Sequence, residues 1–149
     1  MRLQFNVGGQ MELSRVLLNI GNAVQDWTPA FEQSAEDLVE FFSYEVFETE
    51  GGAIDEDWSP LSMAYAKRKA KLYPDQGILE ATGTMRESFL SQADATSLKI
   101  WNAAEYFKYH QSSAPRNKMP RRVMMKLTEN LREVVVKNFQ RQFIEEANR

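Results

Sequence analysis

Apolar residues along this 149-residue chain recur at two different spacings. Leu3, Phe5 and Val7 alternate with polar residues, and this two-residue period predicts a short strand that ends at the glycine pair after it. Between residues 11 and 24 the apolar positions instead recur at three- and four-residue steps, which predicts a helix. Both kinds of element are therefore expected in the fold.

The strongest helical pattern covers residues 28–47. Thr28 is a good N-cap residue, and Pro29 suits the first helical position because its missing N–H is not needed there. The apolar stripe that follows comprises Phe31, Ala35, Leu38, Val39, Phe42 and Val46, and it is widened by Phe41, Tyr44 and Phe47. A helix that is apolar around so much of its circumference is either central to the fold or shared with a partner.

In the middle of the chain, residues 48–90, the pattern predicts loops around one short helix. Residues 48–57 form an acidic loop that contains a glycine pair. Ser59-Pro60 repeats the cap-and-proline signal and predicts a helix through Lys71, whose basic end suits the helix dipole. Residues 73–77 predict a turn, and the pattern leaves the state of residues 85–90 open.

The last third of the chain completes a mixed fold. Residues 97–101 alternate as a strand, and residues 106–110 are expected to be its hairpin partner. Residues 117–125 are loop-like, and Thr128 is the predicted cap of a final helix. Residues 1–149 therefore predict one α+β domain: a small antiparallel sheet packed with several helices, and a long C-terminal helix with an apolar face of Leu131, Val134, Val135, Phe139 and Phe143.

Composition narrows the class of protein. The chain is 43% hydrophobic and has no cysteine, which fits a folded domain and excludes disulfides, a thiolate nucleophile and cysteine-based metal sites. No apolar run approaches the ~20 residues of a membrane-spanning helix, and the start lacks the apolar region of a signal peptide. The chain is expected to fold in a cytoplasm, away from membranes.

The net charge of −3 hides an asymmetry along the chain. Residues 1–60 hold 12 acidic and two basic residues, whereas residues 61–149 hold nine acidic and 16 basic residues. This split favours ordered self-association, in which the acidic face of one subunit meets the basic face of its neighbour. The alternative is that the two faces pair within one subunit or face water.

The sequence gives only weak indications of two kinds of site, a general base and a calcium site. His110, the only histidine, is a candidate general base, but no motif supplies the nucleophile and the orienting acid that a triad requires. Asp55, Glu56 and Asp57, with Glu48 and Glu50, are candidate calcium ligands, but their spacing is not that of an EF-hand loop. A packing histidine and a solvated acidic loop are the simpler interpretations, and no cofactor is expected.

Two basic clusters raise the possibility of nucleic-acid binding. One covers residues 67–71, and the other comprises Arg116, Lys118, Arg121, Arg122 and Lys126. Phosphate contacts need only clustered cations, so this signal is unspecific. Neither cluster lies on a recognisable helix-turn-helix, which leaves passive proximity to DNA as the more modest expectation.

Four segments, in order, carry a more specific pattern. They are Phe47 with Gly51-Gly52 and the run Asp57-Trp-Ser-Pro-Leu-Ser62; Ile78-Leu-Glu-Ala-Thr-Gly-Thr-Met-Arg-Glu-Ser88; Tyr106-Phe-Lys-Tyr-His-Gln111; and Met119-Pro-Arg-Arg122. Together they resemble the phage virion morphogenesis family, the tail-completion proteins of Mu-like and related tailed phages. The resemblance spans residues 47–122, about half of the chain.

The chain departs from the family pattern at several positions. Met85 stands in place of the usual leucine, and Phe107 and Arg121 each stand in place of an alanine. The glycine that commonly follows the His-Gln pair is here a serine, Ser112 or Ser113. These departures concern the 106–111 segment and the turn after it more than the assignment to the family.

The resemblance implies a structural, non-enzymatic protein of the virion that completes the tail or helps to form the head–tail neck. It would be a ring-forming subunit like a tail terminator or neck protein, in a ring of six because tails of this kind are built on sixfold symmetry. Its implied partners are other copies of itself, the tail tube and the neck or connector proteins, with genomic DNA nearby in the channel. Assembly would take place in the host cytoplasm.

Physical chemistry suggests roles for the residues of these segments. Trp58 can dock the acidic loop onto the core, and the Thr82-Gly83 pair can reverse the chain. We expect the candidate subunit-interface residues to be Trp58, Arg86, His110, Gln111, Arg121 and Arg122. His110 and Gln111 can bond loops of the same or an adjacent subunit, and the arginines can pair with carboxylates. Two further hypotheses stay open: a DNA-associated accessory protein that uses residues 116–126, and a small hydrolase or peptidoglycan-active factor that uses His110.

Overall fold

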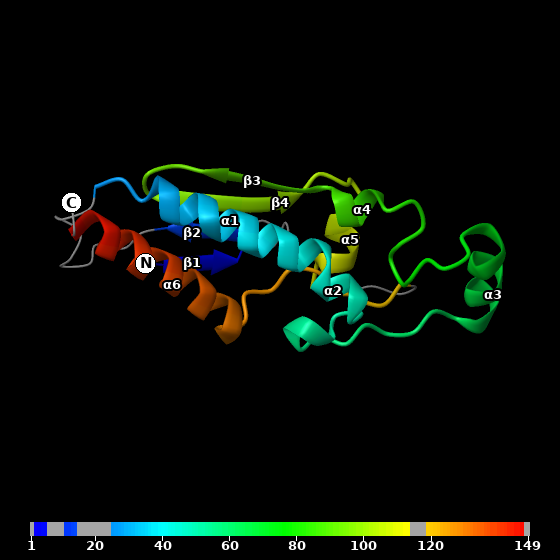
Figure 1. The fold of residues 1–149 in the computed structure, drawn as a ribbon. Helices are drawn as coiled ribbons and strands as arrows, with labels where there is room; N and C mark the ends of the chain where they lie inside the picture. Colours follow the sequence, from blue (N-terminus) through cyan, green and yellow to red (C-terminus); the bar gives the residue numbers. More distant parts are fainter. Residues whose placement is uncertain (1, 6–10, 15–24, 114–118, 148–149) are drawn as a thin grey trace.

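A computed structural model describes residues 2–5, 11–14, 25–113 and 119–147 of the chain (Figure 1). In chain order the elements are β1 (Arg2–Phe5), β2 (Met11–Ser14), α1 (Thr28–Ser43), α2 (Glu45–Glu48), the 3₁₀ turn η1 (Gly52–Ile54), α3 (Met63–Leu72), α4 (Thr84–Glu87), β3 (Phe89–Ala93), β4 (Ser97–Asn102), α5 (Phe107–Gln111) and α6 (Glu129–Ala147). The predicted α+β class, with an antiparallel sheet, several helices and a long C-terminal helix, is confirmed at this level.

The strands form one antiparallel sheet in the order β1-β2-β4-β3. The predicted strands at residues 3–7 and 97–101 are confirmed where the structure describes them, over residues 2–5 and 97–102. The helix predicted for residues 11–24 is wrong over residues 11–14, which pair with β1 and β4 as strand β2. Two apolar residues in so short a run fit either period, so pairing with neighbours decides the outcome. Residues 15–24 lie outside the described part of the chain.

Helix α1 is the centre of the packing, as its broad apolar stripe predicts. It lies along β3 and β4 on one side and beside α6 on the other (Figure 1). Phe31, Leu38 and Phe42 are fully buried in the core that these elements share. The helix begins at Thr28, one residue before the predicted start, and Asp26 rather than Thr28 accepts the backbone N–H at this end, at 2.9 Å.

The seam between α1 and α6 combines aromatic and amide contacts. The Phe139 ring meets the Phe31 ring edge-on, with 4.9 Å between their centroids. The Gln142 side chain bonds the backbone N–H of Ala30 at 2.8 Å, and Asn138 Nδ2 donates to Ser34 Oγ at 3.1 Å. Such buried, satisfied amides fix how the two helices align along each other. The predicted cap of α6 is confirmed, because Thr128 Oγ1 accepts from the N–H of Leu131 at 3.3 Å.

The segment expected to be the hairpin partner of β4 is instead a helix. Residues 107–111 form α5, and the partners of β4 are β2 and β3. Phe107 and Gln111 are both buried, and their four-residue spacing is that of one helical face. A five-residue aromatic run fits a strand or a helix equally well, and the tertiary burial of Phe107 against Phe89 favours the helix. Residues 85–90, whose state the pattern left open, hold most of α4 and the first two residues of β3.

Helix α3 stands apart from the body of the molecule. It lies at the end of the fold that is farthest from the start of α1, and two extended segments connect it to the body (Figure 1). The helix predicted to begin at Ser59-Pro60 begins at Met63, and Ser62 is its cap, accepting from the Tyr65 N–H at 3.3 Å. The turn predicted at residues 73–77 is confirmed. Among the helices of the described residues, none is long and apolar enough to span a membrane.

Candidate functional site: a groove and a projecting helix

Trp58 holds the acidic loop against the body, as the sequence predicts. Its ring meets Phe47 edge-on at 5.3 Å, and its Nε1 donates to the backbone carbonyl of Val123 at 2.7 Å. This close approach requires Gly51, which has φ +88°, and a Cβ there would lie 2.0 Å from the Glu56 carbonyl oxygen and 2.7 Å from the Trp58 ring. The loop therefore has a defined shape, with its indole at the base of the segment that leads to α3.

Arg86 joins helix α4, on which it lies, to the end of α1. Its Nε donates to the Ser43 carbonyl at 2.6 Å, and its guanidinium pairs with Glu80 and with Glu48, the latter at 2.9 Å. The guanidinium also lies 5.1 Å from the centre of the Tyr44 ring. Burial on its own lowers the pKa of Arg86, but the bonds to the two carboxylates outweigh it, so the pKa is raised above its ordinary value.

Gln111 fastens the segment before α6 to helix α5. Its Oε1 accepts from the backbone N–H of Met124 at 2.9 Å and of Met125 at 3.1 Å, and its Nε2 donates to the Met125 carbonyl at 2.7 Å. One buried amide thus satisfies backbone groups of a segment that has no strand partner of its own within the described residues. The predicted bond between Gln111 and a loop of the same chain is confirmed.

The two arginines of the Met119–Arg122 turn have different surroundings. Arg121 is exposed, and its Nε donates to the Gln111 carbonyl at 3.0 Å. Arg122 is buried, and it donates to the Ser59 carbonyl from Nε at 3.0 Å and from Nη2 at 2.8 Å. Burial lowers the pKa of Arg122. The sequence predicted carboxylate partners, whereas the bonds of both side chains go to backbone carbonyls of the same chain.

Lys69 is a site residue that the sequence does not reveal. It lies on α3 but is only 5% exposed, because it points back toward the body and donates to the Gly77 carbonyl. Burial lowers the pKa of Lys69, and the nearby positive charge of Arg122 lowers it further against the opposing effect of Glu80. A lysine within a run of cations resembles a solvated face, so no local signal distinguishes it from its neighbours.

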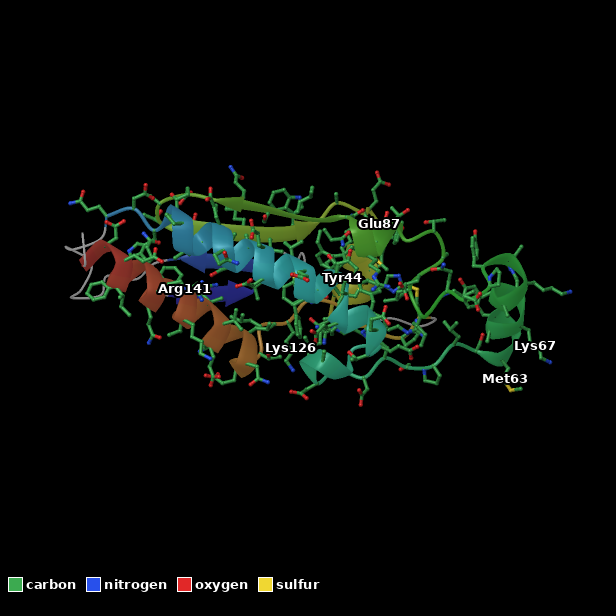
Figure 2. All side chains as sticks on the ribbon, viewed as in Figure 1. Tyr44, Met63, Lys67, Glu87, Lys126 and Arg141 are labelled. Atoms are coloured by element: carbon green, nitrogen blue, oxygen red, sulfur yellow. The ribbon has the colours of Figure 1, made fainter. Side chains whose placement is uncertain are left out.

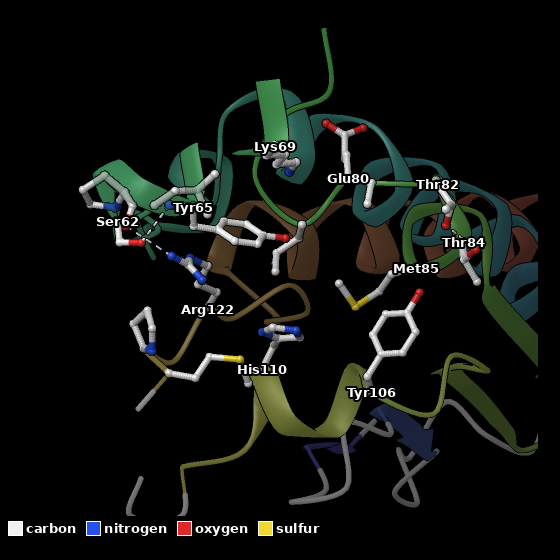
Figure 3. Close-up of a pocket in the computed structure, with 17 residues that line it drawn as sticks. Ser62, Tyr65, Lys69, Glu80, Thr82, Thr84, Met85, Tyr106, His110 and Arg122 are labelled. Atoms are coloured by element: carbon white, nitrogen blue, oxygen red, sulfur yellow. Dashed lines mark hydrogen bonds between the residues drawn. The ribbon is translucent and has the colours of Figure 1, made fainter. Parts of the chain in front are cut away.

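An open groove of about 850 Å³ lies between α3, α5 and the turn before α4 (Figure 3). His110 on α5 and Tyr106, the residue before α5, form one wall, with Met85 facing them, while Lys69 and Glu80 lie on the opposite side. All four segments that carry the family resemblance contribute to its lining, at residues 60–62, 79–85, 106 and 110, and 119, 120 and 122. Segments that are far apart in the sequence thus meet at one place.

The residues considered for metal binding and for nucleic-acid binding have the following surroundings. Glu48 pairs with Arg86, and Glu56 of the acidic loop pairs with Lys126 at 3.1 Å. Within the described ranges no group of three or more histidine and acidic side chains is placed to hold a metal ion. Of the second basic cluster, Arg116 and Lys118 lie outside the described residues, and its other members do not form one exposed patch because Arg122 is buried.

The outward side of α3 exposes both apolar and basic side chains. Met63 is 80% exposed and Leu72 is 61% exposed, values far from those of core residues. Arg68 and Lys71 are exposed beside them. Met63 and Lys67 point away from the body, at its far end (Figure 2). We call residues 63–72, with the extended segments on either side, the α3 arm.

The outward side of α1 exposes an acidic ridge. Glu36, Glu40 and Tyr44 follow one another at four-residue steps, and all three are exposed. A shallow groove of about 690 Å³ separates this ridge from β3, where Leu90 is 46% exposed. A second groove, of about 470 Å³, separates it from α6. We call this surface the α1 ridge.

The chain was compared with protein families, with curated proteins and with solved structures, and none of them matches it.

Proposed function

We propose that this chain is a structural phage assembly protein that completes or terminates the tail and helps to form the head–tail neck. One observation carries the proposal. The four segments that resemble the virion morphogenesis family, spread over residues 47–122, line a single groove. A resemblance scattered at random along the chain would have no reason to converge in space.

A non-enzymatic role is supported by the bonds of the residues in these segments. Trp58, Gln111 and Arg122 all bond to backbone groups of the same chain, which suits side chains that hold loops in a fixed shape. Arg86 already donates to two carboxylates and one carbonyl of the same chain. The interface roles of these residues stay a prediction. Their contacts within the chain favour an indirect role, in which these side chains shape the surface that a partner contacts.

Ring formation is supported by two surfaces of different character. A closed head-to-tail ring needs two complementary patches on each subunit. The α3 arm is basic and apolar, whereas the α1 ridge is acidic with an aromatic end. A sixfold ring that contacts the tail tube on one side and neck or connector proteins on the other is the assembly that the family resemblance implies.

Electron microscopy of lysates from a phage that lacks this gene tests the proposal. We expect filled heads beside unjoined or overlong tails, and normal virions when the intact gene is supplied in trans. Complementation with His110→Ala tests the hydrolase hypothesis, which predicts that this variant leaves assembly intact while it abolishes an activity. Normal virions without the gene would overturn the proposal in favour of the DNA-accessory or hydrolase hypothesis.

A further inference from the structure

We propose that the α3 arm of one subunit docks on the α1 ridge of a second copy of the chain. This inference rests on the self-assembly proposed above and names the two surfaces that carry it. It begins from the exposure of Met63 and Leu72, large apolar side chains at the two ends of a helix that projects from the body. Covering such side chains is favourable by about 25 cal/mol for each Å² of apolar surface removed from water.

The arm presents its charges and an apolar side chain together. Lys71 and Leu72 lie three and four residues after Arg68, so both are its neighbours on the helix surface. Lys69 is the exception, because it points inward to the Gly77 carbonyl and leaves the outward side to the other cations. The outward side therefore suits a partner surface that is acidic with an apolar floor.

The α1 ridge has that composition. Glu36 and Glu40 provide negative charge, and Tyr44, which is 59% exposed, continues the row at the same spacing. Val39 and Leu90 contribute apolar side chains to the groove beside the ridge. Arg86 also lines this groove, but its charge is already met by Glu48 and Glu80. Opposite charges on the two surfaces favour the encounter and set its direction.

The two surfaces also agree in length. Helix α3 has ten residues and is about 15 Å long, and the eight-residue step from Glu36 to Tyr44 covers about 12 Å. One helix can therefore lie along the ridge over most of its length.

The arm is held away from the ridge of its own subunit. Arg122 bonds the Ser59 carbonyl on the segment that enters α3, and Lys69 bonds the Gly77 carbonyl on the segment that leaves it. These contacts orient α3 away from the body, where Met63 and Lys67 face solvent (Figure 2). A second copy is the occupant that the complementarity favours, and the contact is head-to-tail because the two surfaces differ.

Charge reversal on the full-length chain tests the inference by sedimentation velocity over a range of concentrations. Arg68→Glu with Lys71→Glu reverses the arm, and Glu36→Lys with Glu40→Lys reverses the ridge. We expect each double variant to raise the concentration needed for assembly by about tenfold or more. The quadruple variant, which exchanges the charges, should assemble within about threefold of wild type.

The matched control for the arm variant is Lys137→Glu with Arg141→Glu, which makes the same change in net charge on exposed residues of α6. Circular dichroism shows whether each variant is folded. If the wild type assembles and arm reversal affects it no more than the control does, the docking inference is overturned while the proposed function stands. If the wild type is a monomer at every concentration, the proposed self-assembly fails and the docking inference fails with it.

Discussion

The body around α1 and the α3 arm use apolar residues in opposite ways. In the body, Leu38 and Phe42 are fully removed from water, and burial of each side chain contributes about 1.5 to 3 kcal/mol to folding. On the arm, Met63 and Leu72 face solvent and contribute little to the stability of one subunit. The stability of a single subunit therefore accounts for the apolar residues of the body, whereas it does not account for the exposed apolar residues of the arm, which the proposed docking would cover.

The two regions also differ in how they are held. The body is packed ring against ring, as between Phe31 and Phe139. The arm is fastened at its base by Arg122, which donates to the Ser59 carbonyl, and within the arm Lys69 donates to the Gly77 carbonyl. Such bonds orient a segment without requiring an apolar core of its own.

Truncating one leucine in each region gives the largest expected contrast. Leu38→Ala should lower the free energy of unfolding by about 3 to 5 kcal/mol, because it leaves a cavity in the core. Leu72→Ala should change it by less than about 0.5 kcal/mol in the monomer, since the side chain is exposed. Urea denaturation at a concentration below assembly measures both. A loss of similar size for the two variants would contradict the distinction between body and arm.

The glycine pair at the base of the arm gives a contrast of intermediate size. Gly51→Ala should destabilise the chain by about 2 to 4 kcal/mol, because φ is +88° and the new Cβ would clash with the Glu56 carbonyl and Trp58. Gly52→Ala is the matched control and should cost under about 1 kcal/mol, since its nearest neighbour is the Asp57 carboxylate at 3.3 Å.

Thermal unfolding of both glycine variants, with tryptophan fluorescence as a second readout, checks this prediction. Gly51→Ala should also change the emission of Trp58, because the indole can no longer keep its place against the loop. Equal effects of the two substitutions would show that the close approach of loop and indole is unimportant.

The smallest expected effect concerns the turn between β3 and β4, which belongs to the body. Asp94 accepts from the N–H of Thr96 and from the hydroxyl and N–H of Ser97, and these bonds lower its pKa below the ordinary 3.8. The stability that they add is complete above pH 3.8 and is lost as the pH falls through the lowered pKa.

Asp94→Asn should therefore be less stable than wild type at neutral pH, with a difference that shrinks as the pH falls through this range. Denaturation curves at several pH values measure it, and Asp55→Asn, on the loop between α2 and α3, is the control. A difference between Asp94→Asn and wild type that stays constant with pH would contradict the assigned role of the carboxylate.

Sequence patterns predicted the long elements well. Helices α1 and α6 and strand β4 follow from sustained periods, and the cap at Thr128 is where it was expected. Short runs were predicted poorly, because residues 11–14 and 106–110 fit either period and tertiary contacts decide between them. The start of α3 was misplaced because two serines, at 59 and 62, could each cap the helix, and only Ser62 does so.

The site was predicted in part. The four segments of the family resemblance contribute to one groove, but of the six residues singled out as interface candidates only His110 and Arg122 line it. The sequence also does not reveal that Gln111 and Arg122 bond to backbone groups of the same chain. Such bonds depend on how loops distant in the sequence approach each other. Lys69 was missed because its orientation depends on where the segment after α3 returns past it.

Inter-subunit cross-linking tests the central claim most directly. Because the chain has no cysteine, Leu72→Cys on the arm and Leu90→Cys beside the ridge introduce single, defined thiols. A disulfide needs Cβ atoms within about 4.5 Å, so oxidation should join only surfaces that meet. A mixture of the two single variants should give a cross-linked dimer. A chain that carries both cysteines should give a series of cross-linked oligomers up to the size of the ring. Cross-linking no stronger than with the exposed control Ile144→Cys in place of Leu90→Cys would contradict the docking of arm on ridge.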